Sequence, residues 1–215
     1  MEIQGIDKNI ANIIASGSSG NCEIYHNNIA VDMGVPYSKI KPYINNLQIV
    51  LLTHLHFDHF NITTIKKLAF ERPTLRFGCG EWMVEFLKGI KNVDVYQFGE
   101  TYNYGSFKIS MGKCYHDVPN AFFRIFKDQT KIIHCTDTAH LEGIEAKGYD
   151  LYALEHNYDE DTVFESIAKI EAGGGFAHQK GAINSHLSEQ QARDFIFKNA
   201  GENYKVVRLH ESKTR

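Results

Sequence analysis

The chain has 215 residues, of which 43% are hydrophobic and 12% aromatic, so it can bury a sizeable core within one domain. Its formal net charge is −3, which provides no global basic field for nucleic acid, although a local basic patch stays possible. The most apolar windows are much shorter than a membrane span, and the first residues lack the pattern of a secretory signal. We therefore expect no membrane partner and a cytoplasmic location.

The four cysteines are dispersed along the chain, at Cys22, Cys79, Cys114 and Cys135. No C-x-x-C pair occurs, so neither a zinc ribbon nor a redox motif is indicated. Reduced, mostly buried thiols are the simplest interpretation, and they agree with a cytoplasmic protein.

The chain begins with a pattern of short strands and turns. Apolar residues predict strands over Ile10–Ala15, Cys22–Tyr25 and Ile29–Asp32. A Gly/Ser cluster from Ser16 to Asn21 separates the first two strands. We interpret this cluster as a tight turn, with exposed backbone N–H groups that bind an anion as the alternative. Asp32 then places a carboxylate at the end of the third strand.

The most informative stretch follows the next predicted strand, Ile49–Leu52. The run ends abruptly in three histidines and an aspartate, namely His54, His56, Asp58 and His59. Two imidazoles separated by one residue can converge on one ion if the backbone is extended, and the adjacent Asp-His pair can serve a second ion. Imidazole and carboxylate suit zinc, and also manganese or iron. A merely polar loop is the alternative, but this density of ligands favours a metal site.

The rest of the chain alternates helices and strands. Amphipathic patterns predict helices over Asn61–Glu71, Gly80–Lys91 and Glu189–Ala200, the last opened by a Ser188/Gln191 capping box. Further strands are predicted over these ranges: Thr74–Gly78, Val93–Phe98, Thr101–Tyr104, Phe107–Cys114, Lys131–Cys135, Leu151–Leu154 and Val206–Leu209. Strands mixed with helices indicate an α/β (α+β) protein, and no repeat or linker divides it.

The segment Thr53-His54-Leu55-His56-Phe57-Asp58-His59 resembles the signature loop of the metallo-β-lactamase superfamily. The resemblance implies an αβ/βα four-layer sandwich that forms a single domain over residues 1–215. It also implies further ligands after later strands, and residues of the required types occur there. His116 follows the strand Phe107–Cys114, Asp137 follows Lys131–Cys135, and His186 precedes the last helix.

The resemblance also distributes the ligands over two divalent metals, with zinc the first choice and manganese or iron as alternatives. His54, His56 and His116 bind one metal, Asp58, His59 and His186 bind the other, and Asp137 bridges them. Asp32 braces the histidine loop from behind. Two such ions, about 3.5–4 Å apart with a shared hydroxide, are an arrangement for displacement at phosphorus or carbonyl carbon.

Several features indicate the branch of the superfamily. Zinc β-lactamases usually carry Cys at the position of Asp137, and flavodiiron proteins carry Glu at the position of His56, so neither activity is favoured. The opening S-G-S-S-G-N-C is similar to YycJ/WalJ-like hydrolases and to small phage-encoded relatives. His186-Leu187-Ser188 and the terminal His210 resemble motifs of the same nuclease-related branch, close to RNase Z-type phosphodiesterases.

Proton transfer to a leaving alkoxide needs a further titratable group. Glu155 and His156 lie in a stretch that resembles the E-x-N-x-D segment of WalJ-like proteins, and His210 ends the last strand. His178 follows three glycines that form either a lid hinge or a plain surface loop. Asp58 is expected to orient the attacking hydroxide. A surface histidine near the terminus is the alternative for His210.

We therefore expect a two-metal hydrolase, a phosphodiesterase that acts on a nucleotide, a cyclic nucleotide or a short nucleic acid. The net charge of −3 gives a long polyanion little electrostatic help. Phage relatives of RNase Z that destroy cyclic nucleotide immune signals, the anti-Pycsar type, are similar in size and ligand set, and would act in the host cytoplasm. A thioester or lactone hydrolase and a non-catalytic nucleotide-binding decoy are the alternatives. A homodimer is expected by analogy with the superfamily.

Overall fold

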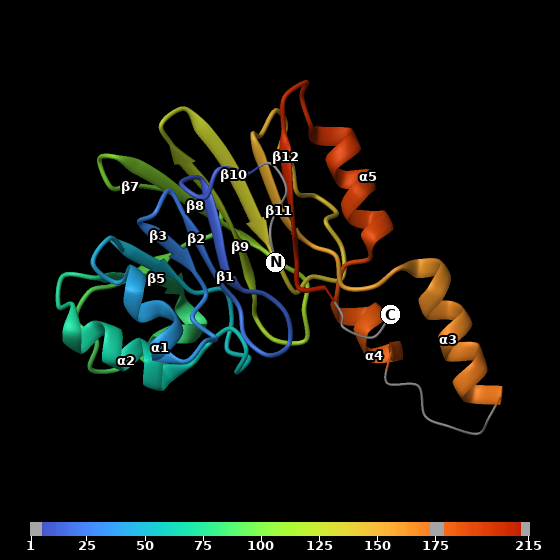
Figure 1. Cartoon of the computed structure of the whole chain (residues 1–215), viewed down its shortest axis with the longest axis horizontal. Coiled ribbons are helices and arrows are strands. Elements are labelled where there is room, and N and C mark those ends of the chain that lie inside the picture. Colours follow the sequence, from blue (N-terminus) through green and yellow to red (C-terminus); the bar gives the residue numbers. More distant parts are fainter. Residues whose placement is uncertain (1–5, 173–178, 212–215) are drawn as a thin grey trace. The chain divides into compact units, whose positions relative to one another are not determined.

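The computed structural model describes residues 6–172 and 179–211 (Figure 1). The chain divides into two compact units, the first made of Met1–Tyr104 with Ser110–Gly112 and the second of Gly105–Ile109 with Lys113–Arg215. A single domain over residues 1–215 stays a prediction. Within the described residues, no helix combines the length and apolarity that crossing a membrane requires.

The first unit is built on a six-stranded mixed sheet in the order β1-β2-β3-β4-β5-β6. The first three strands pair antiparallel, and β3 to β6 pair parallel. Every residue of β4 is buried, as its uninterrupted apolar sequence predicts. The strands are β1 (Ala11–Ala15), β2 (Cys22–Tyr25), β3 (Ile29–Val31), β4 (Ile49–Leu51), β5 (Arg76–Gly80) and β6 (Val93–Tyr96).

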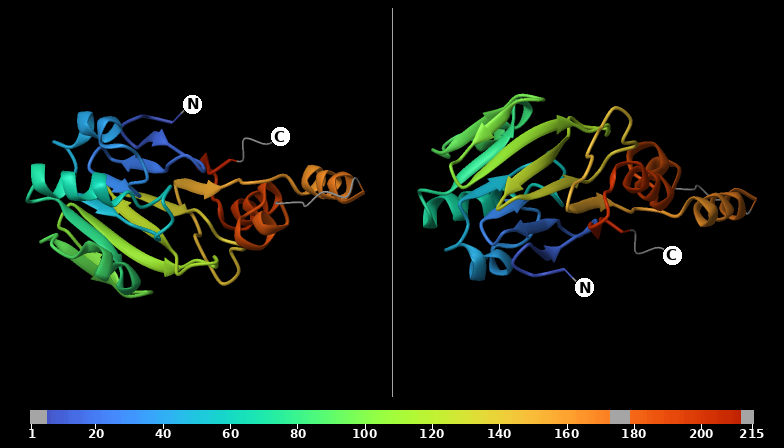
Figure 2. Two further views of the ribbon diagram at one scale, coloured as in Figure 1. Left: turned by 90° about the horizontal axis from the view of Figure 1, so that it is seen from below. Right: turned by 90° about the horizontal axis from the view of Figure 1, so that it is seen from above.

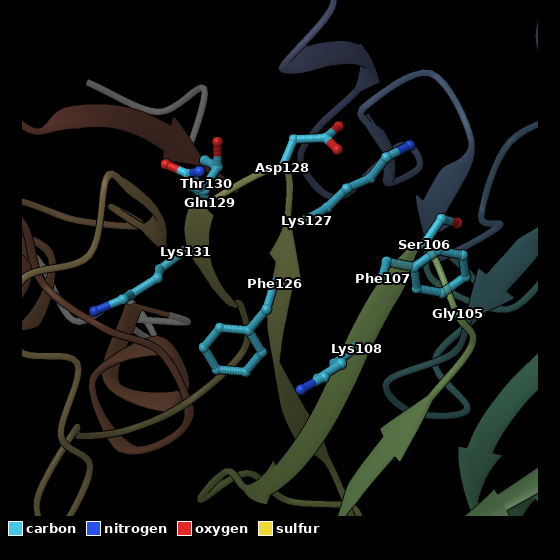
Figure 3. A pocket seen from close by; sticks show the side chains of 10 residues that line it. All are labelled: Gly105, Ser106, Phe107, Lys108, Phe126, Lys127, Asp128, Gln129, Thr130 and Lys131. Atoms are coloured by element: carbon cyan, nitrogen blue, oxygen red, sulfur yellow. The ribbon is translucent and has the colours of Figure 1, made fainter.

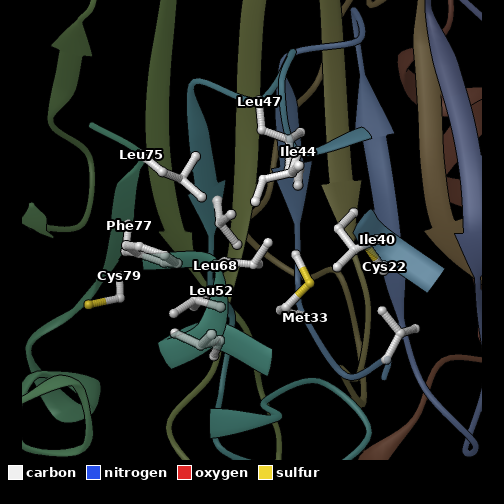
Figure 4. Close-up of a cluster of buried hydrophobic side chains, with 14 of the residues drawn as sticks. Cys22, Met33, Ile40, Ile44, Leu47, Leu52, Leu68, Leu75, Phe77 and Cys79 are labelled. Carbon is white, nitrogen blue, oxygen red and sulfur yellow. The ribbon is translucent and has the colours of Figure 1, made fainter. Parts of the chain in front are cut away.

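Short helices pack against one face of this sheet. They are α1 (Tyr37–Ile40), the 3-10 helix η1 (Lys41–Tyr43), α2 (Ile62–Glu71) and the 3-10 helix η2 (Glu81–Leu87). Asn61 caps α2 by accepting a hydrogen bond from the Thr64 N–H at 3.1 Å. Figure 4 shows the resulting core, in which Leu68 of α2 lies near Leu52, which directly follows β4, and Phe77 of β5.

The helix predicted over Gly80–Lys91 is present but shorter, and it is the 3-10 helix η2 (Glu81–Leu87). The chain leaves the helical conformation at Lys88, and Gly89 has a positive φ of 89° that favours glycine. Met83 and Leu87 lie in the core, which confirms that the apolar residues of this segment form a buried face. In a 3-10 helix, residues i and i+3 lie on the same side. A seven-residue 3-10 helix can therefore bury the same apolar residues as a longer α-helix.

The second sheet runs in the order β12-β11-β10-β9-β8-β7. It is also mixed, because β11 pairs parallel with both β10 and β12, whereas β9 pairs antiparallel with β10. The pattern of β9 gave no strand prediction, although its residues form a long hairpin with β10. The strands are β7 (Thr101–Asn103), β8 (Phe107–Lys113), β9 (Ala121–Lys127), β10 (Thr130–Cys135), β11 (Leu151–Glu155) and β12 (Lys205–Leu209).

The described part of the second unit contains three helices: α3 (Glu160–Ala172), α4 (Gln179–Ser185) and α5 (Glu189–Asn199). The predicted capping box is confirmed, since Ser188 accepts from the Gln191 N–H and the Gln191 side chain accepts from the Ser188 N–H. Phe195 and Ile196 of α5 pack on the sheet core. Figure 2 shows α3, in orange, beyond α5, in red, at one edge of this unit.

Parallel pairing decides where polar side chains gather. In the first unit, β3 and β4 end at the same edge of the sheet, and Asp32 and Thr53 follow them. In the second unit, β10, β11 and β12 end together, and Asp137, Glu155 and His210 lie at or just after those ends. Loops at the carboxyl ends of parallel strands are a common place for active sites.

Candidate metal centre

The histidine loop of the first unit leaves β4 and turns back on itself. The His59 N–H donates to the His56 carbonyl at 2.9 Å, which closes the turn. His54 and His59 are fully buried, and Asp58 is 8% exposed. One ligand atom of His54 lies within 4.8 Å of one of His56, and Asp58 Oδ2 lies 3.7 Å from His59 Nε2. The loop thus gathers the four predicted ligands as two pairs.

Asp32 fixes the orientation of this loop. It lies directly after β3 with a positive φ of 58°, a conformation that aspartate tolerates better than most residues, and it is fully buried. Its carboxylate accepts the Thr53 N–H at 2.9 Å and lies 2.6 Å from His59 Nδ1. A carboxylate next to Nδ1 places the proton there, so the Nε2 lone pair of His59 is the ligand atom.

The hydroxyl of Thr53 extends the same control to His54. Its oxygen lies 2.9 Å from both carboxylate oxygens of Asp32 and 2.9 Å from His54 Nδ1. Because the carboxylate can only accept, the hydroxyl proton points to Asp32 and the hydroxyl oxygen accepts from the Nδ1 of His54. One buried carboxylate therefore sets the tautomer of two imidazoles, one directly and one through Thr53.

The Gly/Ser turn of the first unit packs against this loop, which sequence reasoning missed. Asn21 accepts the Gly17 N–H at 2.7 Å, as the tight-turn interpretation requires, and its Nδ2 lies 2.8 Å from His59 Nε2. The Nε2 lone pair can serve either that amide or a metal, so metal binding at His59 requires Asn21 to turn aside. The only sequence signal was an asparagine among small residues, which is typical of any turn.

A close backbone contact explains the glycine at position 34, two residues after Asp32. A Cβ built on Gly34 would lie 1.7 Å from the Asp58 carbonyl oxygen. The Gly34 N–H also donates to the Asn21 carbonyl at 2.9 Å, and the Asn21 N–H donates to the Asp58 carbonyl at 2.6 Å. Only glycine permits this approach, so Gly34 lets three segments of the first unit meet around Asp58.

The second unit positions His116 and Asp137 near each other. His116 Nδ1 donates to the Ser185 carbonyl at 2.8 Å, which leaves Nε2 as its ligand atom. This Nε2 lies 3.7 Å from Asp137 Oδ2 and 3.1 Å from Asp117 Oδ1. Burial lowers the pKa of His116, although Asp137 acts in the opposite direction, so the ring favours the neutral form that binds metals.

Glu155 is the central acceptor of the second unit. It is fully buried, and its Oε1 lies 2.6 Å from His186 Nδ1 and 3.3 Å from His210 Nδ1. Its Oε2 accepts the N–H groups of Thr138 and Leu187, each at 3.1 Å. Burial alone would raise the pKa of Glu155, but hydrogen bonds to the two histidines outweigh it and lower the pKa.

The same hydrogen bond affects the imidazole. Burial alone would lower the pKa of His186, but the hydrogen bond to Glu155 and the negative charges of Glu155 and Asp137 together outweigh it, so the pKa of His186 is raised. With its proton on Nδ1 facing Glu155, His186 presents Nε2 as its ligand atom. Glu155 therefore acts on His186 as Asp32 acts on His59.

The predicted proton-transfer residues separate into three groups. Glu155 and His210 lie with Asp137 and His186, and the ligand atoms of these four residues lie within 4.8 Å of one another. His156 is not brought into this group. Its Nδ1 lies 2.9 Å from the Leu154 carbonyl oxygen, and burial lowers its pKa in the neighbourhood of Arg208 and Glu189. His178 lies outside the described residues.

His210 is held by a residue that sequence reasoning did not assign. Asn157 Nδ2 lies 3.0 Å from His210 Nδ1 and donates to the His210 carbonyl at 3.1 Å. His210 has a positive φ of 50°, and its Nε2 lies 3.8 Å from Asp137 Oδ1. Asp137 itself has a φ of 55°. Such conformations persist where the surrounding contacts hold them, which is frequent at functional sites.

The donor set in each unit fits divalent metals. The first unit offers the imidazoles of His54 and His59, whose Nδ1 atoms are held by Thr53 and Asp32, together with the carboxylate of Asp58. The second offers imidazoles held by Glu155 or a backbone carbonyl, plus the carboxylate of Asp137. Imidazole nitrogen with carboxylate oxygen is the chemistry of zinc, manganese and iron sites, and outer partners on the second ring nitrogen are typical of metal-bound histidine.

Fold and donor set together define a metallo-β-lactamase-type domain, and the family comparison agrees. The model of the β-lactamase superfamily domain matches residues 18–151, which is more than half of the chain. The chain therefore belongs to the β-lactamase superfamily. A comparison with proteins of curated function finds no match.

Solved structures with the same fold cover nearly the whole chain. The metallo-β-lactamase fold protein YhfI from Bacillus subtilis is 19% identical, with a TM-score of 0.72 over 95% of this chain and 87% of that one. The short form of human tRNase Z, ELAC1, is 13% identical, with a TM-score of 0.66 over 94% and 92%. A diphosphatase of the PhnP family is 14% identical, with a TM-score of 0.65 over 94% and 85%. The predicted fold class is confirmed.

Proposed function

We propose that the chain is a hydrolase that depends on two divalent metals, zinc in the first place, and that it cleaves phosphodiesters of a nucleotide, a cyclic nucleotide or a nucleic acid. The observation that carries this proposal is the pair of buried carboxylates, Asp32 and Glu155. Each directs the Nδ1 of a candidate ligand histidine and leaves its Nε2 as the ligand atom. A merely polar loop has no need for such an arrangement.

The ligand assignment that we propose follows the superfamily motif. One metal takes His54, His56 and His116, the other takes Asp58, His59 and His186, and Asp137 serves both. When bound, two such metals supply a water of lowered pKa and stabilise negative charge on the transition state. Asp58 orients the attacking oxygen, and Asp32 with Thr53 holds the Nδ1 of His59 and of His54, which leaves Nε2 of each ring as the ligand atom.

For proton transfer to the leaving group we propose His210 with Glu155. His210 Nδ1 lies 3.3 Å from Glu155 Oε1, so a proton taken or given at the ring is balanced by a buried carboxylate. His156 is a weaker candidate, because its contacts lie with Leu154 and not with this pair. His178 stays a prediction.

The choice of phosphorus over carbon as the reacting atom is supported by two of the similar structures, a tRNase Z and a diphosphatase. At 13% and 14% identity these show the fold alone, so the substrate is proposed and not transferred. Five imidazole and two carboxylate ligands without cysteine agree with the phosphodiesterase branch, and equally with the thioester and lactone hydrolases. A homodimer stays a prediction. Four buried free thiols support our proposal that the protein acts in the cytoplasm, host cytoplasm if it is phage-encoded.

Hydrolysis of bis-p-nitrophenyl phosphate by the zinc- or manganese-loaded protein tests the proposal. We expect turnover that chelation removes, and we expect Asp58→Ala to lower it by more than about 100-fold because a metal ligand is lost. Asp161→Ala, an exposed aspartate on α3, is the matched control and should keep full activity. A screen of cyclic nucleotides, single-stranded DNA and RNA ends then identifies the natural class.

Two results would contradict the phosphodiesterase. Cleavage of a glutathione thioester or an acyl-lactone without phosphodiester turnover would establish a carbonyl hydrolase. Tight nucleotide binding that survives chelation and yields no product would establish a binding protein without catalysis.

A further inference from the structure

The first unit contains a cavity of about 490 Å³ beyond the carboxyl end of α2. Its lining combines an apolar surface with three lysines, and includes Lys66, Phe70, Leu75, Lys88, Ile90 and Lys91. None of the ten described residues that line it is acidic. The volume lies within the range of pockets that bind small molecules or one segment of a longer ligand. Apolar side chains combined with lysines, and without an acidic residue, fit a ligand that carries both an apolar ring and negative charge.

The positive charge of this cavity is largely uncompensated. Among the described residues, no ion pair involves Lys66 or Lys91. Lys88 pairs with Glu85, but both side chains are more than 70% exposed, and such a surface pair contributes little. A basic cavity on a chain of net charge −3 concentrates positive potential at one place. An anionic ligand would therefore find its complement here.

Phe70 gives the cavity an aromatic surface. It is 85% exposed, although α2 buries Ile65 and Leu68 on its opposite face. A phenyl ring left in water near the end of an amphipathic helix has no packing role in the core. Together with flanking lysines, an exposed ring is the combination with which proteins bind single strands, because bases stack on the ring and phosphates meet the lysines.

We propose that this cavity binds a segment of single-stranded nucleic acid, with a base on Phe70 and phosphodiester groups at Lys66 and Lys91. The inference rests on the proposed phosphodiesterase activity and selects a polymer among its substrates. Phe70 lies about 12 Å along α2 from Ile62, which follows the histidine loop within three residues. A cyclic mononucleotide cannot reach both places, whereas a strand of several nucleotides can.

A second cavity, in the second unit, differs from the first in the charges that line it. It measures about 300 Å³ and is also lined by three lysines, Lys108, Lys127 and Lys131, but Asp128 lies among them. Figure 3 shows that Lys127 and Lys131 extend in opposite directions around the half-buried Phe126. Lysines that diverge around an acidic residue do not form one anion site. This cavity therefore supplies a matched control with equal loss of charge.

Binding of a fluorescein-labelled single strand of about 12 nucleotides, a length within the usual site sizes, tests the proposal. Fluorescence anisotropy is measured on the metal-loaded protein with phosphorothioate linkages that resist cleavage. We expect Phe70→Ala to weaken binding about tenfold, as for the loss of one stacked base. We expect Lys66→Ala/Lys91→Ala to reduce the slope of log affinity against log salt by about 1.4.

Two comparisons make this outcome specific. Phe70→Tyr keeps a ring for stacking and should bind within twofold of the wild type, and Lys108→Ala/Lys131→Ala should keep the wild-type affinity and salt slope.

The proposal is overturned if Phe70→Ala and Lys66→Ala/Lys91→Ala bind the long strand as the wild type does. It is equally overturned if the Lys108→Ala/Lys131→Ala control loses as much affinity, since general charge would then explain the binding. Failure of the phosphodiesterase is seen separately, as absence of bis-p-nitrophenyl phosphate hydrolysis by the wild type.

Discussion

Asp32 and Glu155 are both fully buried carboxylates that accept backbone N–H groups and contact the Nδ1 of a histidine, one in each unit. They differ in what they hold together. Asp32 serves a single loop, because Thr53 and His59 belong to the same short stretch after β4. Glu155 contacts three separate segments, which follow β10, α4 and β12.

This difference explains how each unit can form its half of the ligand set. A loop with its ligands close in sequence is ordered mostly by its own turns, and its carboxylate only has to fix ring orientation. Ligands from distant segments are brought together by tertiary contacts, so their shared acceptor also joins the segments. We therefore expect Asp32 to matter mainly for metal binding, and Glu155 for metal binding and folding alike.

The strongest test of this comparison is the stability of Glu155→Ala against Asp32→Ala. Removal of Glu155 leaves two buried N–H groups and two histidines without their acceptor, and we expect a loss of about 3–5 kcal/mol in the free energy of unfolding. Asp32→Ala should cost about 1–3 kcal/mol. Urea unfolding of the metal-loaded variants, followed by circular dichroism, gives both values.

Glu142→Ala is the control for the loss of a glutamate in the same unit. Glu142 is exposed, so its replacement should change the free energy of unfolding by less than about 0.5 kcal/mol. An equal or larger cost for Asp32→Ala than for Glu155→Ala would break the comparison, because the local loop would then depend on its carboxylate for folding as well.

Conservative replacements should show how many metals each carboxylate serves. Asp32 controls His54 through Thr53 and His59 directly, and these histidines belong to different metals in the proposed assignment. Asp32→Asn should therefore weaken both zinc equivalents by about 10- to 100-fold. Glu155→Gln acts on His186 alone among the proposed ligands, so only one equivalent should weaken. Competition with a chromophoric chelator resolves the two equivalents.

The reference for this experiment is Glu142→Gln, which changes a carboxylate to an amide at an exposed place and should leave both equivalents unaltered. If Asp32→Asn and Glu155→Gln weaken the same single equivalent, the assignment of His54 and His59 to different metals is wrong.

The sequence alone predicts more of the site in the first unit than in the second, because the ligands of the first unit lie close together in the chain. The histidine loop was recognised at once because four candidate ligands lie within six residues, and the buried run of β4 placed them at a strand end. Asp32 was assigned its bracing role only by resemblance. The strand β9 and the 3-10 form of η2 were not predicted, since short apolar patterns do not distinguish these conformations.

The second unit shows where sequence reasoning ends. Proton transfer by Glu155 stays a prediction, whereas its contacts with distant segments, which the structure shows, were not predicted. His156 is its neighbour in sequence, but alternation at a strand end directs the two side chains differently. No local sequence pattern predicts the contact of Asn157 with His210 or of Asn21 with His59, because both contacts depend on tertiary packing.

The finest test concerns Thr53, the part of the Asp32 network with no equivalent at Glu155. Thr53→Val keeps the shape of the side chain but removes the hydroxyl that accepts from His54 Nδ1. A single hydrogen bond of this kind contributes about 1 kcal/mol, so the metal bound by His54 should weaken about fivefold while the other stays unchanged. Thr53→Ser restores the hydroxyl and should restore the affinity.

Thr64→Val is the matched control, because Thr64 is also buried and its hydroxyl donates to the Val35 carbonyl and not to a histidine. It should lower stability by a similar amount and leave zinc affinity intact. If Thr53→Ser fails to restore the affinity, Thr53 acts through packing and the relay from Asp32 to His54 is refuted.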